Sequence, residues 1–195
     1  MVTIGVEFGQ RKGPSAICVA TGCPRSVDGR KEYHFAVRAL ERLDVGTKYP
    51  ALADRLAVIE TGVTKMAPDE GISVYVNATG LGEPLVEIID SRIASRVRPV
   101  YLTYGDRRLE DGSRIELGKA FLVSRLQMLF ESSRIHLPST TFHAEVLTKE
   151  LLAYDIQIDE QANQRNGAFR VGTQDDLVTA LGLSVHQEPV GPGIY

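Results

Sequence analysis

Four residues carry the side chains best suited to chemistry in this sequence: Glu7, Asn77, Asp175 and Asp176. The first lies on the polar face of an alternating segment, the second ends a short apolar run, and the two aspartates precede the last amphipathic stretch. Carboxylate and amide oxygens are the ligands that Mg²⁺ and Mn²⁺ prefer. A first-strand acid, a residue at the end of a parallel strand and an acid at the last helix together form the layout of a two-cation nuclease. In such a site, two ions about 4 Å apart activate water and stabilise the leaving oxygen. We therefore predict that all four residues are catalytic and metal-ligating.

Each of these residues also has a simpler structural interpretation. Glu7 could point into solvent, and Asn77, followed by Ala-Thr-Gly, could form a turn. Acids at a helix start are stabilised by the helix dipole and by free backbone N–H groups. Asp175 and Asp176 could therefore be a capping pair. The functional interpretation depends on whether the fold brings the four residues together.

The first segments of the chain predict an antiparallel sheet. Residues 2–8 alternate between apolar and small or polar side chains, which is typical of a half-buried strand. Two further strands are predicted over residues 15–21 and 33–43, separated by a loop over residues 22–31. Three antiparallel strands would thus open the chain.

The remainder of the chain alternates between helices and strands, which is typical of an α/β domain with parallel strands. Helices are predicted over residues 49–63, 84–94, 119–130, 142–152 and 175–186, and strands over residues 72–76, 97–103, 134–137 and 154–158. Asp-Gly within the polar stretch 105–118 predicts a hairpin. We expect one α/β domain over residues 1–187, with a central mixed sheet flanked by helices, and an irregular tail over residues 188–195.

Composition limits the function classes. The 195 residues fit one domain, and 43% hydrophobic with 24% charged residues is ordinary for a soluble globular protein. A net charge of -3 gives no general basic field, so DNA contacts must come from a local surface. Cys18 in an apolar run and Cys23 in a Gly-Cys-Pro turn have no zinc-site spacing. With no apolar run of about 20 residues and no signal-peptide pattern, we expect a reduced, cytoplasmic protein.

Several motifs follow one another in order over residues 2–187. They are Gly5–Gln10, Leu40–Pro50, Val76–Gly82, Gly105-Asp106, Lys119, Leu122–Gln127 and Gln174–Leu181. This series resembles the C-terminal nuclease domain of phage terminase large subunits. The resemblance implies a ribonuclease-H-like fold, cleavage of viral DNA during genome packaging, and acids that hold Mg²⁺ or Mn²⁺.

The chain departs from the family at its acids. Aspartates stand in the family where this chain has Glu7 and Asn77, and a histidine stands where it has Gln174. The extra methylene of Glu7 displaces the carboxylate by about an ångström, whereas catalytic geometry tolerates about 0.5 Å. Asn77 lacks the charge altogether. We therefore expect weakened metal binding, above all for a second ion.

Basic residues near the predicted site would contact the phosphate backbone of double-stranded DNA. The nucleic-acid-binding candidates are Arg11 and Lys12 in the first turn, Arg107 and Arg108 in the predicted hairpin, and Lys119. Solvated surface charges are the alternative explanation for each. The sequence has no Gly-x-x-x-x-Gly-Lys-Ser/Thr phosphate loop, so a terminase ATPase motor or portal would be a separate partner.

Three functions remain open on the sequence alone. The first is a terminase-type endonuclease that hydrolyses viral DNA in a bacterial host cell and is weakened at its acids. The second is a non-catalytic, terminase-derived DNA- or protein-binding module, as in a prophage remnant. The third is a ribonuclease-H-like resolvase of Holliday junctions, which fits the ordered motifs less well.

Overall fold

The alternating N-terminal segment forms a strand in the middle of one mixed sheet. The computed structural model describes residues 1–9, 13–80, 83–138, 143–153 and 175–188. Within these residues the sheet has eight strands in the order β6-β7-β5-β4-β1-β2-β3-β8. Strand β1 (Val2–Glu7) pairs antiparallel with β2 (Ser15–Val27) and parallel with β4 (Ile72–Asn77). It therefore joins an antiparallel half of the sheet to a parallel half.

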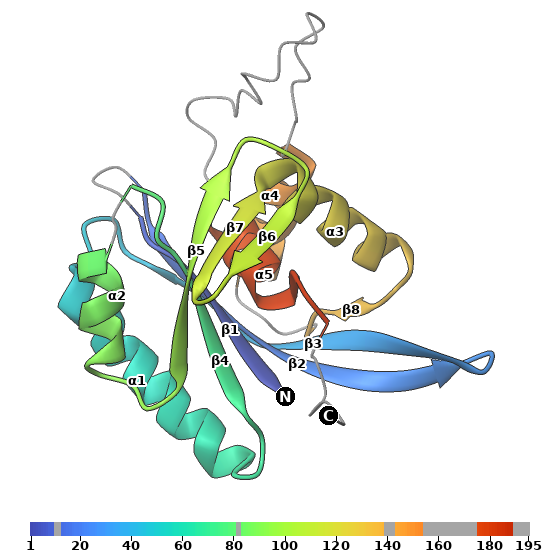
Figure 1. Ribbon diagram of the computed structural model, residues 1–195, viewed down its shortest axis with the longest axis horizontal. Coiled ribbons are helices and arrows are strands. Elements are labelled where there is room, and N and C mark those ends of the chain that lie inside the picture. Colours follow the sequence, from blue (N-terminus) through green and yellow to red (C-terminus); the bar gives the residue numbers. More distant parts are fainter. Residues whose placement is uncertain (10–12, 81–82, 139–142, 154–174, 189–195) are drawn as a thin grey trace, which may run out of the picture.

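The antiparallel half is longer than the sequence predicts. Strands β2 and β3 (Arg30–Leu43) pair up to a two-residue turn at Asp28-Gly29, so the loop predicted over residues 22–31 is wrong. Pro24 is tolerated there because this part of β2 extends beyond β1 and its outer edge has no strand partner among the described residues. The two turn residues have φ values of 51° and 76°, which the Asp-Gly pair accommodates. The result is a ribbon that projects from the body (Figure 1).

The two cysteines have different environments. Cys18 is buried in the core, as predicted, and Cys23 lies exposed in β2 and not in a turn. Both are free thiols. Beyond β3, the short strand β8 (Ile135–His136) adds a parallel edge to this half of the sheet.

The parallel half follows the prediction. Strand β4 is followed by helix α2 (Glu83–Asp90) and by strand β5 (Arg96–Thr103), which pairs parallel with β4. Strand β7 (Arg114–Gly118) pairs parallel with β5 and forms the predicted hairpin with β6 (Arg108–Asp111). Helix α2 ends at Asp90, four residues earlier than expected.

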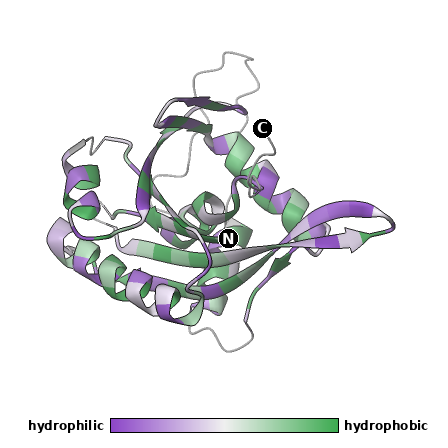
Figure 2. Cartoon of the chain, turned by 60° about the horizontal axis from the view of Figure 1, so that its bottom comes forward, coloured by the Kyte–Doolittle hydropathy of each residue, from purple (hydrophilic) through white to green (hydrophobic). Residues whose placement is uncertain are grey.

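Helices cover both faces of the sheet. Helices α1 (Tyr49–Met66) and α2 lie on one face, against the apolar side chains Val2, Ile4 and Val6 of β1. Helices α3 (Lys119–Glu131), α4 (Ala144–Ala153) and α5 (Asp176–Val185) cover the other face (Figure 1). Hydrophobic residues accordingly run along the central strands (Figure 2). The predicted strand over residues 154–158 lies outside the described residues. Residues 189–195 of the predicted tail also lie outside them.

Helix α5 is buried along its whole length and packs directly on β1. A Cβ atom on Gly5 would come within 2.1 Å of the Ala180 carbonyl oxygen, so the two backbones meet where the strand has no side chain. Thr3 Oγ1 also donates a hydrogen bond of 2.7 Å to the Ser184 carbonyl. The register between helix and strand is therefore fixed by backbone contact.

Gly5→Ala is expected to lower the free energy of unfolding by about 3 kcal/mol, because the added methyl must push α5 away from β1. The matched control is Gly62→Ala in the exposed face of α1, where a Cβ meets no atom within 4 Å. That change should stabilise the helix by about 1 kcal/mol. Urea denaturation compares the two, and equal stability of Gly5→Ala and wild type would contradict the packing described.

Candidate functional site

The carboxyl ends of several parallel strands meet at one edge of the sheet. Glu7 ends β1, Asn77 ends β4, and Lys119 begins α3 directly after β7. Helix α5 begins beside the same edge with Asp175 and Asp176. In open α/β sheets this edge is where ligands bind. The fold thus gathers residues that are up to 169 positions apart in the sequence.

Glu7 and Asn77 contact one another directly. The Asn77 Nδ2 group donates a hydrogen bond of 2.7 Å to Glu7 Oε2. The Asn77 Oδ1 atom accepts the backbone N–H of Thr79 at 3.0 Å, which fixes the orientation of the amide. The amide therefore presents its N–H, and not its oxygen, to the acid.

Burial raises the pKa of Glu7 from an ordinary 4.5 to about 8. The hydrogen bond from Asn77 and the charge of Lys119 oppose this rise, whereas the negative charges of Asp175 and Asp176 add to it. Burial likewise raises the pKa of Asp175, and Lys119 again opposes the rise. Three carboxyl groups, those of Glu7, Asp175 and Asp176, and the ammonium group of Lys119 thus act on one another here. At pH 7 Glu7 is mainly protonated, with the proton on Oε1 because Oε2 accepts from Asn77.

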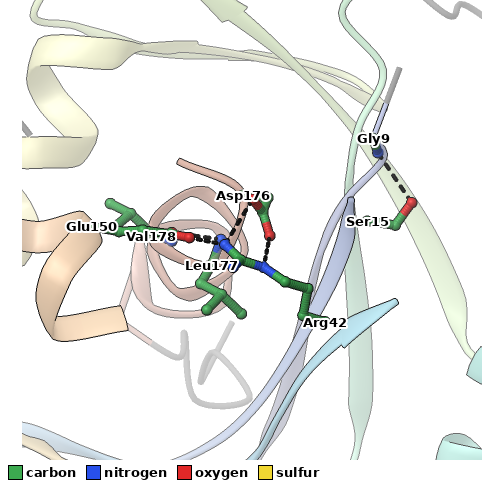
Figure 3. Close-up of polar contacts among 7 residues, drawn as sticks. All are labelled: Gly9, Ser15, Arg42, Glu150, Asp176, Leu177 and Val178. Carbon is green, nitrogen blue, oxygen red and sulfur yellow. Dashed lines mark hydrogen bonds and ion pairs between the residues drawn. The ribbon is translucent and has the colours of Figure 1, made fainter. Parts of the chain in front are cut away.

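The two adjacent aspartates have different surroundings. Asp176 is 5% exposed and accepts two hydrogen bonds from Arg42 of β3, of 2.7 Å to Oδ2 and 2.9 Å to Oδ1. The same guanidinium also donates to Glu150 of α4. Figure 3 shows Arg42 between the two carboxylates. Both oxygens of Asp176 are therefore held by an ion pair, whereas Asp175 has the stronger effect on the pKa of Glu7.

Glu150 caps α5 in place of either aspartate. Its Oε2 atom accepts the backbone N–H groups of Leu177 and Val178 at 3.0 and 3.2 Å (Figure 3). The Asp175 side chain makes no capping hydrogen bond. The simpler interpretation of the aspartates as a capping pair is therefore not what the structure shows. Glu150 and Arg42 together fix the start of α5 and with it the position of Asp175.

Two solved structures of a viral terminase nuclease domain are similar to this chain. The human cytomegalovirus terminase nuclease domain shares 15% identity with this chain at a TM-score of 0.56, covering 93% of this chain and 81% of that one. The manganese-soaked form of that domain gives 15% identity and a TM-score of 0.55, covering 93% and 80%. The chain has the ribonuclease-H-like fold of a terminase nuclease domain. The predicted fold class is confirmed, whereas no family model and no curated protein matches the sequence.

The terminase nuclease fold raises the question of whether this edge can hold divalent cations. Among the described residues, no three histidine, cysteine, aspartate or glutamate side chains gather into a metal-binding group. Asn77 turns its N–H toward Glu7, and Asp176 is paired with Arg42. Of the three predicted carboxyl groups, those of Glu7 and Asp175 remain as candidates to hold a cation. Two carboxyl groups are fewer ligands than a pair of hard cations usually takes.

The predicted DNA-binding residues lie in different environments. Arg107 is exposed beside Asp106 at the start of the hairpin. Arg108 is instead bonded to Glu110 and Gln187 behind the hairpin. Lys119 lies close enough to the acids to affect the pKa of both. Arg11, Lys12 and Gln174 lie outside the described residues. None of the helices described is long and apolar enough to cross a membrane.

Sequence reasoning missed the residues that act through contacts across the fold. Arg42 and Glu150 are 108 positions apart and neither stands in a pattern that predicts an ion pair. His34 and His136 lie 3.1 Å apart on neighbouring strands, although their sequence spacing predicts no relation. Only the pairing of β3 with β8 brings these histidines together.

Glu7 should make stability depend on pH. Its pKa is about 8 in the folded protein, whereas an exposed glutamate, as in the unfolded chain, has a pKa of 4.5. The folded state therefore binds the proton more tightly than the unfolded state does. Its contribution is then fully present below about pH 4.5 and is lost as the pH rises toward 8. Relative to Glu7→Gln, wild type should lose on the order of 5 kcal/mol over that window. Urea denaturation in a chelating buffer measures this, and parallel pH profiles for the two proteins would exclude the raised pKa.

Arg42→Ala should lower the free energy of unfolding by about 3–5 kcal/mol, because it leaves the buried carboxylates of Glu150 and Asp176 without a cation. Arg55→Ala is the matched control, since Arg55 pairs with Glu41 through a more exposed bidentate contact. Its loss should cost less than about 1 kcal/mol. If thermal unfolding shows the two variants to be equally stable, Arg42 does not hold α5 in place.

Proposed function

We propose that this chain is a nuclease domain of the terminase type that hydrolyses double-stranded DNA at the edge formed by Glu7, Asn77 and Asp175. The observation that carries the proposal is the hydrogen bond between Glu7 and Asn77 beside Asp175. It joins the ends of β1 and β4, and the negative charge of Asp175 at the start of α5 acts on Glu7. The terminase nuclease fold supports the same reaction class. Asp176 is assigned a structural role, because Arg42 occupies both of its oxygens.

The protein residues can move a proton and balance charge. Without a cation, a Glu7 carboxyl group with a pKa of about 8 exchanges its proton near neutral pH, so a cation that binds Glu7 displaces that proton. Asn77 holds one oxygen, Oε2, and so fixes the direction of the acid. Lys119 places a positive charge near both acids, which favours the approach of a phosphate group.

Glu7 and Asp175 would hold a divalent cation, Mg²⁺ or Mn²⁺. When bound, such an ion polarises a phosphate oxygen and lowers the pKa of an attacking water. The related cytomegalovirus domain is described as manganese-soaked, which supports the choice of metal. The protonation of Glu7 and the amide of Asn77 both oppose binding, so we expect low affinity that improves as the pH rises.

The biological setting follows from the terminase resemblance and belongs to the same proposal. The substrate would be concatemeric viral DNA of a phage or prophage. A terminase motor or portal would be the partner that delivers it. Arg107 is exposed at the start of the hairpin, and we assign it to contact with the phosphate backbone of DNA.

Cleavage of supercoiled plasmid in Mn²⁺ should fall at least about 100-fold in Glu7→Ala and in Asp175→Ala. Asn77→Asp should raise cleavage about tenfold, because it restores a carboxylate that can hold the cation. Asp54→Ala is the matched acidic control, since Asp54 lies exposed on α1 across the sheet. It should cut like wild type.

The outcomes separate the proposed functions. Wild-type cleavage that survives in both acid variants would show that the site lies elsewhere. Absence of cleavage in wild type together with its appearance in Asn77→Asp would identify a non-catalytic relative that retains the fold. Calorimetric titration with Mn²⁺ gives the stoichiometry independently, and two equivalents bound at the site would contradict the binding of a single cation.

A further inference from the structure

Two histidines meet ring to ring at the edge of the sheet formed by β3 and β8. His34 Nδ1 lies 3.1 Å from His136 Nε2. The ring planes are nearly parallel, at 11°, and the ring centroids lie 5.3 Å apart. The centroid distance exceeds the nitrogen–nitrogen distance by about the width of one ring, so the rings meet edge to edge through these two nitrogens. One nitrogen must therefore donate an N–H group to the lone pair of the other.

This contact limits how many protons the two rings can hold. With both rings neutral, or with one ring charged, one of the two nitrogens remains free to accept the hydrogen bond. With both rings charged, two N–H groups would point at one another across 3.1 Å, so the bond is lost and two positive charges repel. The pair in contact therefore holds at most one proton beyond its neutral form, whereas two separated histidines each titrate at about pH 6.5.

The surroundings of the pair act against the second proton. Burial lowers the pKa of His34, and the positive charges of Arg25 on β2, of the second histidine and of Arg134 beside β8 lower it further. Glu32, on the same strand as His34, opposes the change. Arg134 is itself paired with Glu188, which follows α5. Among the described residues, the charges that act on His34 therefore favour its neutral form.

The strand that carries His136 has few other attachments to the sheet. Strand β8 is two residues long and pairs with β3 at two positions. The Phe35 N–H group donates to the Arg134 carbonyl at 2.7 Å, and Arg134 Nε donates to the Tyr33 carbonyl at 2.8 Å. Ile135 is buried against the core. Short edge strands with so few contacts open at a lower cost than the body of a sheet, so the histidine contact is an appreciable part of what holds β8.

We propose that His34 and His136 form an acid-sensitive latch, which holds β8 against β3 at neutral pH and releases it when both rings are protonated. Separated rings bind the second proton more tightly than the rings in contact do, so the latch weakens as the pH falls below 6.5. The chain continues from β8 to α4, whose Glu150 bonds the first backbone N–H groups of α5. Release of β8 therefore removes one attachment of the segment that supports the start of α5.

Hydrogen exchange of the Phe35 amide tests the latch, because this N–H group is bonded to the residue that precedes β8. In wild type its protection factor should fall about tenfold between neutral pH and about pH 5, since a hydrogen bond is lost and two like charges face one another. His136→Gln has no second ring to protonate, so its protection factor should stay constant. His143→Gln, which changes a histidine outside the pair, should behave like wild type. Wild-type protection that is independent of pH, or an equal fall in His136→Gln, would overturn the proposal.

An NMR titration of the imidazole nitrogens of wild type gives a second test that needs no variant. The pair should take up its protons in two separate steps, and the protection of the Phe35 amide should fall with the second step. This result supports the latch even if His136→Gln fails to hold β8 at any pH. Coincident titration of both rings with unchanged Phe35 protection would overturn it. Both measurements use a chelating buffer without DNA, so they do not depend on the proposed nuclease activity, and the two proposals can fail separately.

Discussion

The close approach of α5 to β1 is the constraint on which the rest of the structure depends. Because Gly5 has no side chain, the helix backbone lies directly against the central strand, with Ala180 as its nearest contact. This approach buries α5 completely and fixes where both of its ends lie. The acidic edge is then a consequence of this helix position, since Asp175 and Asp176 lie at the start of that helix.

A buried charge network maintains the position of the helix start. Arg42 joins Asp176 to Glu150, and Glu150 bonds the first free backbone N–H groups of α5. The network joins β3, α4 and α5, and so it holds the segment from which Asp175 acts on Glu7. A change in this network should therefore affect both the stability of the protein and the position of Asp175.

Some of the site followed from sequence and some did not. Glu7 and Asn77 could be placed because each ends a strand whose periodicity is clear, and parallel strands bring their carboxyl ends together. Asp175 and Asp176 could not be told apart, because the difference comes from Arg42, a residue on another strand.

The ribbon of β2 and β3 and the buried arginines show the same limit. Gly-Cys-Pro and Asp-Gly are local turn signals, yet pairing with a neighbouring strand overrides the first of them. Arg98, Arg108 and Arg125 lie on three separate elements, β5, β6 and α3, and each of them alone resembles a surface charge although the fold covers most of its side chain. The local sequence pattern predicts helices and strands well, whereas the partners of charged side chains are set by tertiary contacts.

The ten residues of α5 also act as a ruler. At 1.5 Å per residue, the helix separates its acidic start from its far end at Val185 by about 15 Å. A fully buried helix cannot stretch, so the distance between the acidic edge and the opposite side of the molecule is fixed by the length of α5.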